Sequence, residues 1–380
     1  MASINDFFDE KWSRRIQLWK KANSVAYSVS NLEEVENLSS GDRVHRPKAF
    51  DFVVNDYSRT ADQNLQAIET DDQYIDINRQ KQVSFYIDKL DETQSKYNLS
   101  GEAVDRAVYR IANEIDQTRF KETLNANYTA DDGTIGGTPG NAISTVSANF
   151  YKLFPSVKGM MANARIETDR AWYAVLSPEM VAGIEITALE KGFQKADSTM
   201  EAGYKGNFGG FRIYESTNLA HEYKILAANL GAGKVVINGV ELTYNATATA
   251  VDQYKNADDL VAIINTGVGT QTTNTISAGV STTLKGLQAT AVKSGSDVII
   301  TTAGVATITS NSTASAGVCY NEFGRMGAVD VVTQLKPFIQ RNKEPKRTGY
   351  TYLIVDLYGV KTFDEGKQRM VKVKSLPVLS

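Results

Sequence analysis

The chain has 380 residues, of which 42% are hydrophobic and 22% are charged, and its formal net charge is −3. This length allows two or three domains with substantial cores, and the small negative charge argues against tight nucleic-acid binding, which needs a basic excess. The single cysteine, Cys319, excludes an internal disulfide and suits a reducing compartment, and no run approaches the ~20 apolar residues of a membrane span.

The first twenty or so residues predict an amphipathic helix. One helical face carries Phe8, Trp12, Ile16 and Trp19, and basic side chains surround it. A helix of this kind can lie on a membrane, dock on a partner or cover a neighbouring core. We expect docking.

The segment from Gly41 to about Asn98 predicts an extended arm that is dense in charges of both signs. Its apolar residues come in short alternating runs such as Val83, Phe85 and Ile87, so the arm has no obvious core of its own. Ordering such an arm costs conformational entropy unless a surface outside it supplies burial. We therefore expect another copy of the chain to bury the arm, and a lone chain to leave it exposed.

A long amphipathic helix is predicted directly after the arm. Ser100 is a suitable N-cap, and Glu102 places a negative charge in the first turn. The spacing i, i+3, i+4, i+7 is met by Val104, Ala107, Val108, Ile111, Ala112 and Ile115. The helix is predicted to continue through Phe120 to Leu124, about 25 residues or roughly 37 Å. By itself this pattern is typical of an ordinary surface helix.

The next region predicts alternating helices and strands. A second amphipathic helix is indicated by Ile143, Val146, Phe150 and Leu153, with a break near Pro155. Residues Ala171 to Leu176 predict a buried strand, and Ser177-Pro178-Glu179 after it is typical of a helix start. Phe211 to Tyr214 predict another strand.

Composition changes near Tyr223, and from there to about Gly317 the chain is rich in Thr, Ala, Val, Asn, Gly and Ser and poor in charges. Asn238-Gly239 between two apolar runs predicts a hairpin, and Ser294-Gly295 predicts a second. Asn256 is a suitable cap for a short helix. We interpret this region as a small β-rich domain inserted into a larger one, because the helices and strands before it resume after it.

The C-terminal part predicts further strands. They are an apolar run from Ala328 to Leu335, Thr351 to Leu357 and Met370 to Val373. A charged turn is predicted at Arg341 to Arg347, and Tyr358-Gly359 is predicted to separate two strand segments.

A search for reactive motifs identifies no catalytic residue, no cofactor-binding residue and no metal ligand, and therefore no cofactor. The only histidines, His45 and His221, lack the spacing of metal ligands. Gly231-Ala232-Gly233-Lys234 resembles part of a phosphate loop, but Val235 replaces the required Ser or Thr and Ala228 the first glycine.

The acidic clusters and the cysteine also have simple structural explanations. Asp131-Asp132-Gly133 lacks the later bidentate acid of a calcium loop, which favours a turn. Neither acidic pair is typical of a general acid/base pair. Asp71-Asp72 is typical of a solvated face, and Asp258-Asp259 is typical of a helix N-terminus. Cys319 has no base nearby in sequence, which favours a packed, inert thiol. We therefore predict that the protein is not an enzyme.

Six segments occur in an order that is familiar as a set. They are Gly41-Asp42-Arg43-Val44, Val83 to Asp88 with Gln94-Ser95, the helix from Ser100, Ala174 to Pro178, Gly210 to Ser216, and Leu357 to Lys361. In this order they resemble the major capsid protein of tailed phages, the Hong Kong phage capsid fold. The intervening region resembles the β-rich modules of flagellin and hook proteins, through Val236 to Val240 and the helix at Asn256.

The resemblance implies an α+β fold with a fixed division of the chain. The implied parts are an N-terminal arm (1–40), an extended loop over a neighbouring subunit (41–92), a peripheral domain with the long spine helix (93–170), an axial domain in two pieces (171–222 and 318–348), the inserted β-rich domain (223–317), and a C-terminal return to the peripheral domain (349–380).

The resemblance also implies the function and partners of a shell subunit. The chain would assemble with itself as pentamers and hexamers of an icosahedral virion capsid, in the host cytoplasm, around double-stranded DNA that it contacts without sequence specificity. A separate scaffolding protein, a portal and decoration proteins are implied, and no membrane. Some relatives crosslink a loop lysine to an asparagine; Lys48 and Lys81 are candidate lysines here, but the sequence identifies no partner for them.

Two other functions stay open. The β-rich region is also compatible with a surface adhesin or glycan-binding protein, and the shell with a nanocompartment that holds protein cargo. An enzyme is disfavoured by the empty motif search. The size of the purified protein separates a shell from a monomeric binding protein.

Overall fold

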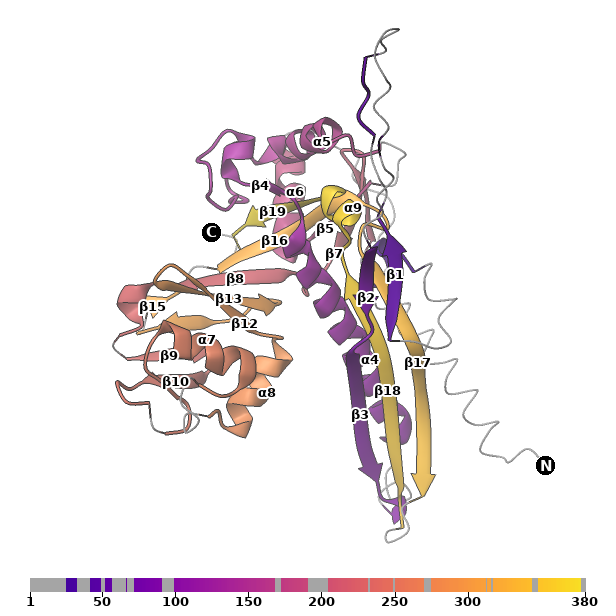
Figure 1. The fold of residues 1–380 in the computed structure, drawn as a ribbon, viewed down its shortest axis with the longest axis vertical. Helices are drawn as coiled ribbons and strands as arrows, with labels where there is room; N and C mark the ends of the chain where they lie inside the picture. The colour runs from indigo at the N-terminus through magenta and orange to yellow at the C-terminus, as the bar shows by residue number, and fades with distance from the viewer. Residues whose placement is uncertain are drawn as a thin grey trace, which may run out of the picture.

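The computed structural model describes residues 25–32, 42–48, 52–56, 66, 72–90, 99–167, 172–190, 204–231, 233–248, 250–269, 275–311, 313–315, 317–343 and 348–376. Figure 1 shows a long three-stranded sheet beside helix α4 (Leu99–Lys121), a mixed sheet with helices at one end of α4, and a lobe next to α4. The predicted N-terminal amphipathic helix lies outside the described residues.

Helix α4 packs its apolar stripe on the three-stranded antiparallel sheet. The strands, in order across the sheet, are β17 (Asp330–Lys343), β18 (Tyr350–Lys361) and β3 (Arg79–Ile87). All six residues of the predicted stripe are buried, which confirms the helix and its orientation. The helix begins at Leu99, so Ser100 lies in its first turn rather than at the N-cap, and the 3-10 turn η2 (Glu122–Asn125) completes the predicted length.

The last turns of α4 differ from a simple amphipathic helix. Every residue from Ile115 to Phe120 is buried, including Asp116, Gln117 and Arg119. Buried polar side chains need hydrogen-bond partners. This end of the helix is therefore where the chain brings several segments together.

The expectation that Val83, Phe85 and Ile87 depend on a neighbouring copy is wrong. They lie on β3, which pairs with β18 from Arg79 to Ile87, and they pack against the core formed by α4 and β18. Phe85 stacks on Tyr352, with ring centroids 5.1 Å apart. Alternation of apolar residues indicated the strand, but the strand that covers it lies about 270 residues further along the chain.

A second sheet of nine strands begins near the upper end of α4 in Figure 1 and extends through β8, β13 and β12 into the lobe beside it. Seven strands follow the order β12-β13-β8-β16-β5-β7-β6, and β19 joins β16 to β4. Their bounds are β4 (Tyr128–Ala130), β5 (Trp172–Leu176), β6 (Tyr204–Phe208), β7 (Phe211–Glu215), β8 (Ala220–Ile225), β12 (Thr290–Ser294), β13 (Asp297–Ala303), β16 (Gly317–Arg325) and β19 (Met370–Ser375).

The helices α5 (Leu153–Asn163) and α6 (Pro178–Glu190) share one core with this sheet. The predicted start of α6 is confirmed, since the Ser177 hydroxyl accepts a hydrogen bond from the Met180 N–H at 3.4 Å. The prediction of a helix marked by Ile143 to Leu153, with a break near Pro155, is wrong, since the α-helix here begins at Leu153 and runs through Pro155. Short 3-10 turns, η3 (Asp132–Ile135) and η4 (Phe150–Lys152), precede α5, and Pro155 lies in its first turn, where proline loses no helical hydrogen bond.

The region of distinct composition contains a five-stranded sheet, two helices and a core of its own, and part of that core lies on β12 and β13, which this region contributes to the nine-stranded sheet. The strands, in order, are β11 (Gln253–Tyr254), β10 (Val240–Tyr244), β9 (Lys234–Ile237), β14 (Ile308–Ser310) and β15 (Thr313–Ala314). The turn η5 (Ala227–Asn229) and helices α7 (Ala257–Thr266) and α8 (Ala278–Gly286) complete it. Every member of its buried cluster lies between Tyr223 and Ile308.

Three local predictions in this region are confirmed. Ile237 pairs with Val240 across Asn238-Gly239, and both turn residues have positive φ, as the tight hairpin requires. Ser294 pairs with Asp297 in the second hairpin. The Asn256 side chain accepts a hydrogen bond from the Asp259 N–H at 2.9 Å and caps α7.

Near the C-terminus, β18 runs without interruption through Tyr358-Gly359, so the predicted separation of strand segments there is wrong. Glycine is needed for another reason: a Cβ on Gly359 would lie 2.6 Å from the Asp76 carbonyl oxygen of a crossing segment. Similarly, β17 extends to Lys343, so Arg341 belongs to a strand and not to a turn. Helix α9 (Asp364–Gln368) links β18 to β19.

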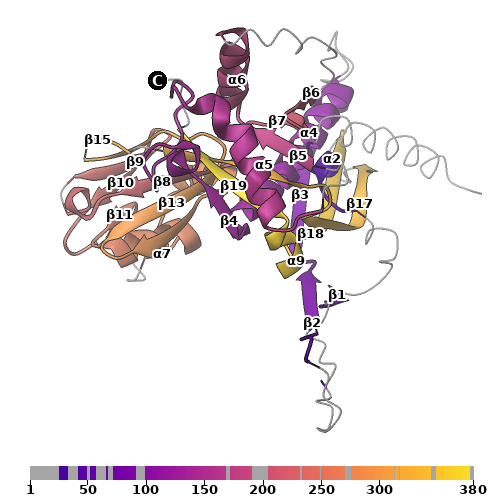
Figure 2. The same ribbon diagram turned by 90° about the horizontal axis from the view of Figure 1, so that it is seen from above.

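Among the described residues, three further elements precede β3 in the chain. The short helix α2 (Ala26–Val29) lies against α4. Strands β1 (Arg43–Pro47) and β2 (Asp72–Asp76) form a two-stranded antiparallel arm. Figure 2, in which the molecule is turned by 90°, shows that this arm points away from the rest of the molecule.

Candidate functional site

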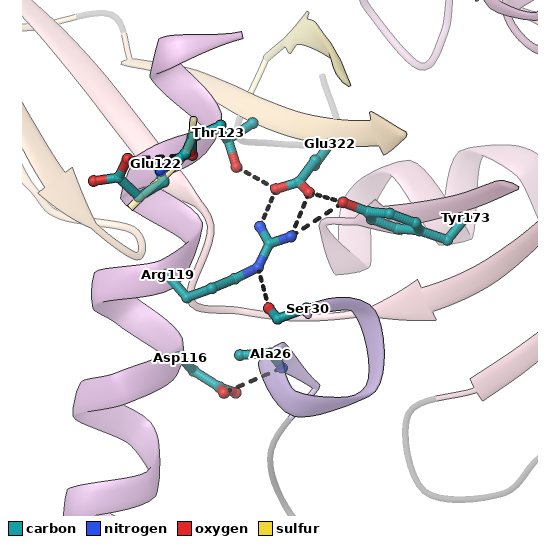
Figure 3. A network of polar contacts seen from close by, with 9 residues as sticks. Ala26, Ser30, Asp116, Arg119, Glu122, Thr123, Tyr173 and Glu322 are labelled. Carbon is teal, nitrogen blue, oxygen red and sulfur yellow. Dashed lines mark hydrogen bonds and ion pairs between the residues drawn. The ribbon is translucent and has the colours of Figure 1, made fainter. Parts of the chain in front are cut away.

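A buried ion pair occupies the junction of α4 with the mixed sheet (Figure 3). The Arg119 guanidinium donates two hydrogen bonds to the Glu322 carboxylate, Nη2 to Oε1 at 2.7 Å and Nη1 to Oε2. The hydroxyls of Tyr173 and Thr123 donate hydrogen bonds to the same carboxylate. Arg119 Nε donates a hydrogen bond to Ser30 Oγ at 2.9 Å. Five segments of the chain therefore meet at one group of hydrogen bonds.

The electrostatics of this cluster depend on the ion pair staying charged. Burial would raise the pKa of Glu322, but the charge and hydrogen bonds of Arg119 outweigh it and hold that pKa below its usual value. Burial and the adjacent Glu322 carboxylate together raise the pKa of Tyr173, so its hydroxyl stays a hydrogen-bond donor. A buried pair of this kind is costly to break, because the remaining charge has no water to solvate it.

The cluster also fixes the segment 25–32 to the body of the protein. The Asp116 carboxylate accepts a hydrogen bond from the Ala26 N–H at 3.3 Å, and Ala26 and Val29 are fully buried against Phe120 and the mixed sheet. Asn31 donates to Asp330 at 2.7 Å. The segment before the arm is thus held within the chain itself.

The base of the arm is anchored in the same way. Val44 on β1 and Ile75 on β2 are buried against Val332 and Phe363. Ion pairs surround this contact: Arg46 with Asp330 at 3.2 Å, and Lys48 with Asp364 at 3.2 Å. The expectation that the whole arm lacks burial in a lone chain is therefore wrong for its base.

The tip of the arm is different. Phe52, Val53 and Val54 are 53%, 70% and 95% exposed. The Gln66 side-chain amide accepts from the Val53 N–H at 2.9 Å and donates to the Val53 carbonyl at 2.5 Å, as a neighbouring strand would. Three consecutive apolar side chains are thus presented to the outside on an extended backbone, which is typical of a surface that another molecule covers.

The residues considered for chemistry have structural partners. His45 contacts the Asp72 carboxylate at 2.5 Å on the exposed arm, and the Nδ1 of buried His221 lies 2.9 Å from the Leu219 carbonyl oxygen. Within the described ranges, no group of three or more His, Cys, Asp or Glu side chains is arranged to hold a metal ion. Burial raises the pKa of the Cys319 thiol to about 12, so it is inert, as expected.

The loops considered for ligands are also explained by local structure. Asp131 caps η3, accepting hydrogen bonds from Thr134 N–H at 3.1 Å and Gly140 N–H at 2.6 Å, which agrees with the predicted turn. Lys234 pairs with Glu241 at 2.7 Å. Asp258 pairs with Lys293 at 2.7 Å in the first turn of α7. Of the two candidate crosslinking lysines, Lys48 pairs with Asp364, and Lys81 pairs with Glu114 at 2.6 Å.

The Arg119–Glu322 pair was not predicted from the sequence. One signal for Arg119 was present: it follows Ile115 by four residues and therefore continues the buried stripe of the helix. A charge on a buried stripe requires a buried partner. Nothing in the sequence marked Glu322, because it lies on a distant strand.

Comparison with known proteins identifies the fold. No protein-family model matches the chain, and no curated protein matches its sequence. Among solved structures, one from Mycobacterium phage Che8 is similar, with 15% identity, 92% of this chain and 90% of that chain covered, and a TM-score of 0.53. The capsid structure of cyanophage P-SCSP1u has 12% identity, covers 90% of this chain and 85% of that chain, and has a TM-score of 0.48. The capsid of Ralstonia phage GP4 has 10% identity, 91% and 86% coverage, and a TM-score of 0.48.

At these identities the likeness concerns the fold. The long helix against a three-stranded sheet, the mixed sheet at its end and the projecting arm are the parts that the sequence resemblance implied. No helix among the described residues is both long and apolar enough to cross a membrane. The chain has the α+β fold of tailed-phage capsid proteins, the Hong Kong phage fold.

Proposed function

We propose that this chain is a major capsid protein, a structural and non-enzymatic subunit that assembles with copies of itself into an icosahedral shell around double-stranded phage DNA. The observation that carries the proposal is the arm: its base is buried in its own chain, and its apolar tip at Phe52 to Val54 is exposed. In a protein with this fold, a neighbouring subunit is the natural surface to cover that tip.

The proposed mechanism is mechanical. The arm is held at its base by Val44 and Ile75 and by the ion pairs of Arg46 and Lys48, so that the tip is presented at a defined place. Burial of the tip on the next subunit supplies apolar contact that a single chain lacks. Repeated around closed pentamers and hexamers, the same contact links every subunit to its neighbour.

The division of the chain is part of the proposal. The spine helix and the three-stranded sheet correspond to a peripheral domain, the mixed sheet to an axial domain, and 223–317 to an inserted domain. Support for the insertion comes from the register of β8 and β16, in which Tyr223 lies opposite Gly317. The two ends of the region are therefore adjacent, as they would be if a hairpin had been opened to receive it.

The remaining partners follow from the same role. A separate scaffolding protein, a portal and decoration proteins would complete the particle, which would assemble in the host cytoplasm. The formal net charge of −3 suits contact with packaged DNA that is neither tight nor sequence-specific.

Light scattering and negative-stain electron microscopy of the purified chain test the proposal. Shells, or pentameric and hexameric capsomers, are expected as concentration rises. A monodisperse monomer at every concentration, with or without a co-expressed scaffold, would contradict it. Binding of the monomer to a glycan array would then favour the adhesin alternative.

A further inference from the structure

A cleft with several charged side chains in its walls lies between the spine helix and the 223–317 region. Its volume is about 870 Å³, and its walls come from β3, from the end of α4, and from α7, α8 and the turn before β12. The charged side chains that line it are Arg79, Lys81, Glu114, Lys121, Glu122 and Lys285. Figure 1 shows α4 and the lobe that contains α8, two of the elements that supply the lining side chains.

The two acids of the cleft are already engaged. Glu114 pairs with Lys81 at 2.6 Å. Glu122 accepts hydrogen bonds from the Thr362 N–H at 3.3 Å and from the Asn125 side chain at 2.9 Å. Among the described residues, no carboxylate lies within ion-pair distance of Arg79, Lys121 or Lys285. Three cations from three different elements thus share one cleft without a matching anion.

Lys121 is the most constrained of the three. Its ammonium group donates to the Gln288 carbonyl and contacts Thr290 Oγ1 at 3.4 Å, which holds it at the wall between α4 and β12. Gln288 itself has a φ of 45°, in the left-handed region, and its side chain donates to the Glu114 carbonyl at 3.2 Å. The position of Lys121 is therefore set by the contact between the helix and the lobe.

The cleft has an excess of positive charge, and this charge affects the pKa of Lys121. Burial, and then the neighbouring Arg79, lower the pKa of Lys121 to about 8, although Glu114 acts in the opposite direction. Lys81 and Lys285 face the same space, and Glu122 is the remaining acid. A bound anion would offset this repulsion and would favour the charged form of Lys121.

We propose that this cleft binds a compact polyanion that carries several phosphate groups, and that the ligand bridges the spine helix to the 223–317 region. A guanidinium and two ammonium groups suit phosphate oxygens, which accept charge-assisted hydrogen bonds. A cleft of about 870 Å³ is far larger than one phosphate group and lies in the range of sites for small-molecule ligands. The ligand is either a free oligophosphate or the phosphorylated end of a nucleic acid, since both present the same chemistry.

Isothermal titration of the full-length protein with inorganic tripolyphosphate tests this inference at low salt. We expect one saturable site per chain. Replacing Lys285 by Gln should weaken binding about tenfold, the effect of losing one charge-assisted hydrogen bond. Lys285 is exposed, so the variant should fold. Lys234→Gln is the matched control, because Lys234 is an exposed lysine in the same region that pairs with Glu241 and does not line the cleft.

Proton linkage supplies a second readout. Because the pKa of Lys121 is lowered to about 8, binding of tripolyphosphate near pH 8 should be accompanied by uptake of a proton by Lys121, measured by titration in buffers of different ionisation enthalpy. Lys121→Met should abolish the uptake. The inference is overturned if tripolyphosphate shows no saturable binding, or if it binds Lys285→Gln as tightly as Lys234→Gln.

Competition then identifies the source of the phosphates. Displacement of tripolyphosphate by a short 5′-phosphorylated oligonucleotide, but not by the same oligonucleotide without the phosphate, would support the site and assign it to a nucleic-acid end. No displacement by either would support the site and assign it to a free oligophosphate. If the oligonucleotides with and without the 5′-phosphate displaced tripolyphosphate equally, the phosphodiester backbone alone would be sufficient for binding. That result would overturn the proposed site for clustered phosphates.

Discussion

Arg119 and Glu322 form a two-pronged ion pair in which both side chains are completely buried, and it joins the spine helix to strand β16 across 203 residues of chain. The hydroxyls of Tyr173 and Thr123 donate to the Glu322 carboxylate, and the Arg119 guanidinium also donates to the Tyr173 hydroxyl and to Ser30 Oγ. The pair therefore decides how the helix, the mixed sheet and the segment before the arm are placed relative to one another.

Replacing Glu322 by Gln should destabilise the protein strongly. The Arg119 charge would stay buried without its counter-ion, which costs about 3–5 kcal/mol when one partner of a buried pair is removed. Urea denaturation followed by tryptophan fluorescence measures the change. Glu241→Gln is the control, because it breaks an exposed pair that is worth about 1 kcal/mol or less. Equal losses for the two variants would show that the buried pair is not a principal contact.

The contribution of Glu322 should depend on pH. Its pKa in the folded protein lies below the value of about 4.3 for an unfolded chain. A lowered folded pKa means that the stabilisation is complete above the unfolded pKa and is lost as pH falls through the folded pKa. The difference in free energy of unfolding between the native chain and Glu322→Gln should thus be constant near neutral pH and shrink below about pH 4. A difference that grows on acidification would contradict this assignment.

Changing the arm tip should affect assembly without affecting the fold. Val54 is 95% exposed, so Val54→Asp removes no contact within the chain. If a neighbouring subunit covers the tip, the buried carboxylate should raise the concentration at which capsomers or shells appear, by tenfold or more for a penalty above about 1.4 kcal/mol.

The matched control for the arm tip is Val251→Asp, at an apolar side chain that is 52% exposed in the 223–317 region. Light scattering should show that it assembles like the native chain, and thermal unfolding should show the same midpoint for both variants. Unimpaired assembly of Val54→Asp would remove the arm tip from the proposed interface.

The region 223–317 should be removable. Because Tyr223 lies opposite Gly317, joining them through Asn-Gly should close β8 and β16 into an ordinary two-residue hairpin. We expect a soluble chain that retains its helical circular dichroism and assembles, with lower stability because α4 loses its hydrogen bonds to Gln288.

A control deletion that ends inside β13, at Ile300, leaves β14 and β15 in the chain without β9, the strand that β14 pairs with, and should be insoluble. If the hairpin-closed deletion is equally insoluble, the region is an integral part of the core and the proposed insertion is wrong.

Local patterns in the sequence were sufficient wherever neighbouring residues settle the structure. The buried stripe of α4, the Asn238-Gly239 and Ser294-Gly295 hairpins and the caps at Ser177 and Asn256 were all predicted correctly, because helix periodicity, tight turns and capping involve residues within about four positions of each other. The order of these elements was also sufficient to indicate the capsid fold.

Contacts between distant segments could not be read in this way. Val83, Phe85 and Ile87 alternate as a strand must, but only the tertiary structure shows that β18 of the same chain covers them. The sequence predicts that Tyr358-Gly359 separates two strand segments, whereas Gly359 is needed because the Asp76 carbonyl crosses close to it. Both depend on which residue lies opposite in space.

By itself, then, the sequence determined the elements that local patterns settle, such as α4 and the two hairpins, and it indicated the type of fold. The tertiary structure alone decided which part of the arm is buried within its own chain and which part is exposed. Ile75 is buried, and Val54 is exposed. It also decided that Arg119 meets Glu322. Burial and ion pairing depend on distance in space, and the periodicity of a sequence carries no information about segments that lie hundreds of residues apart.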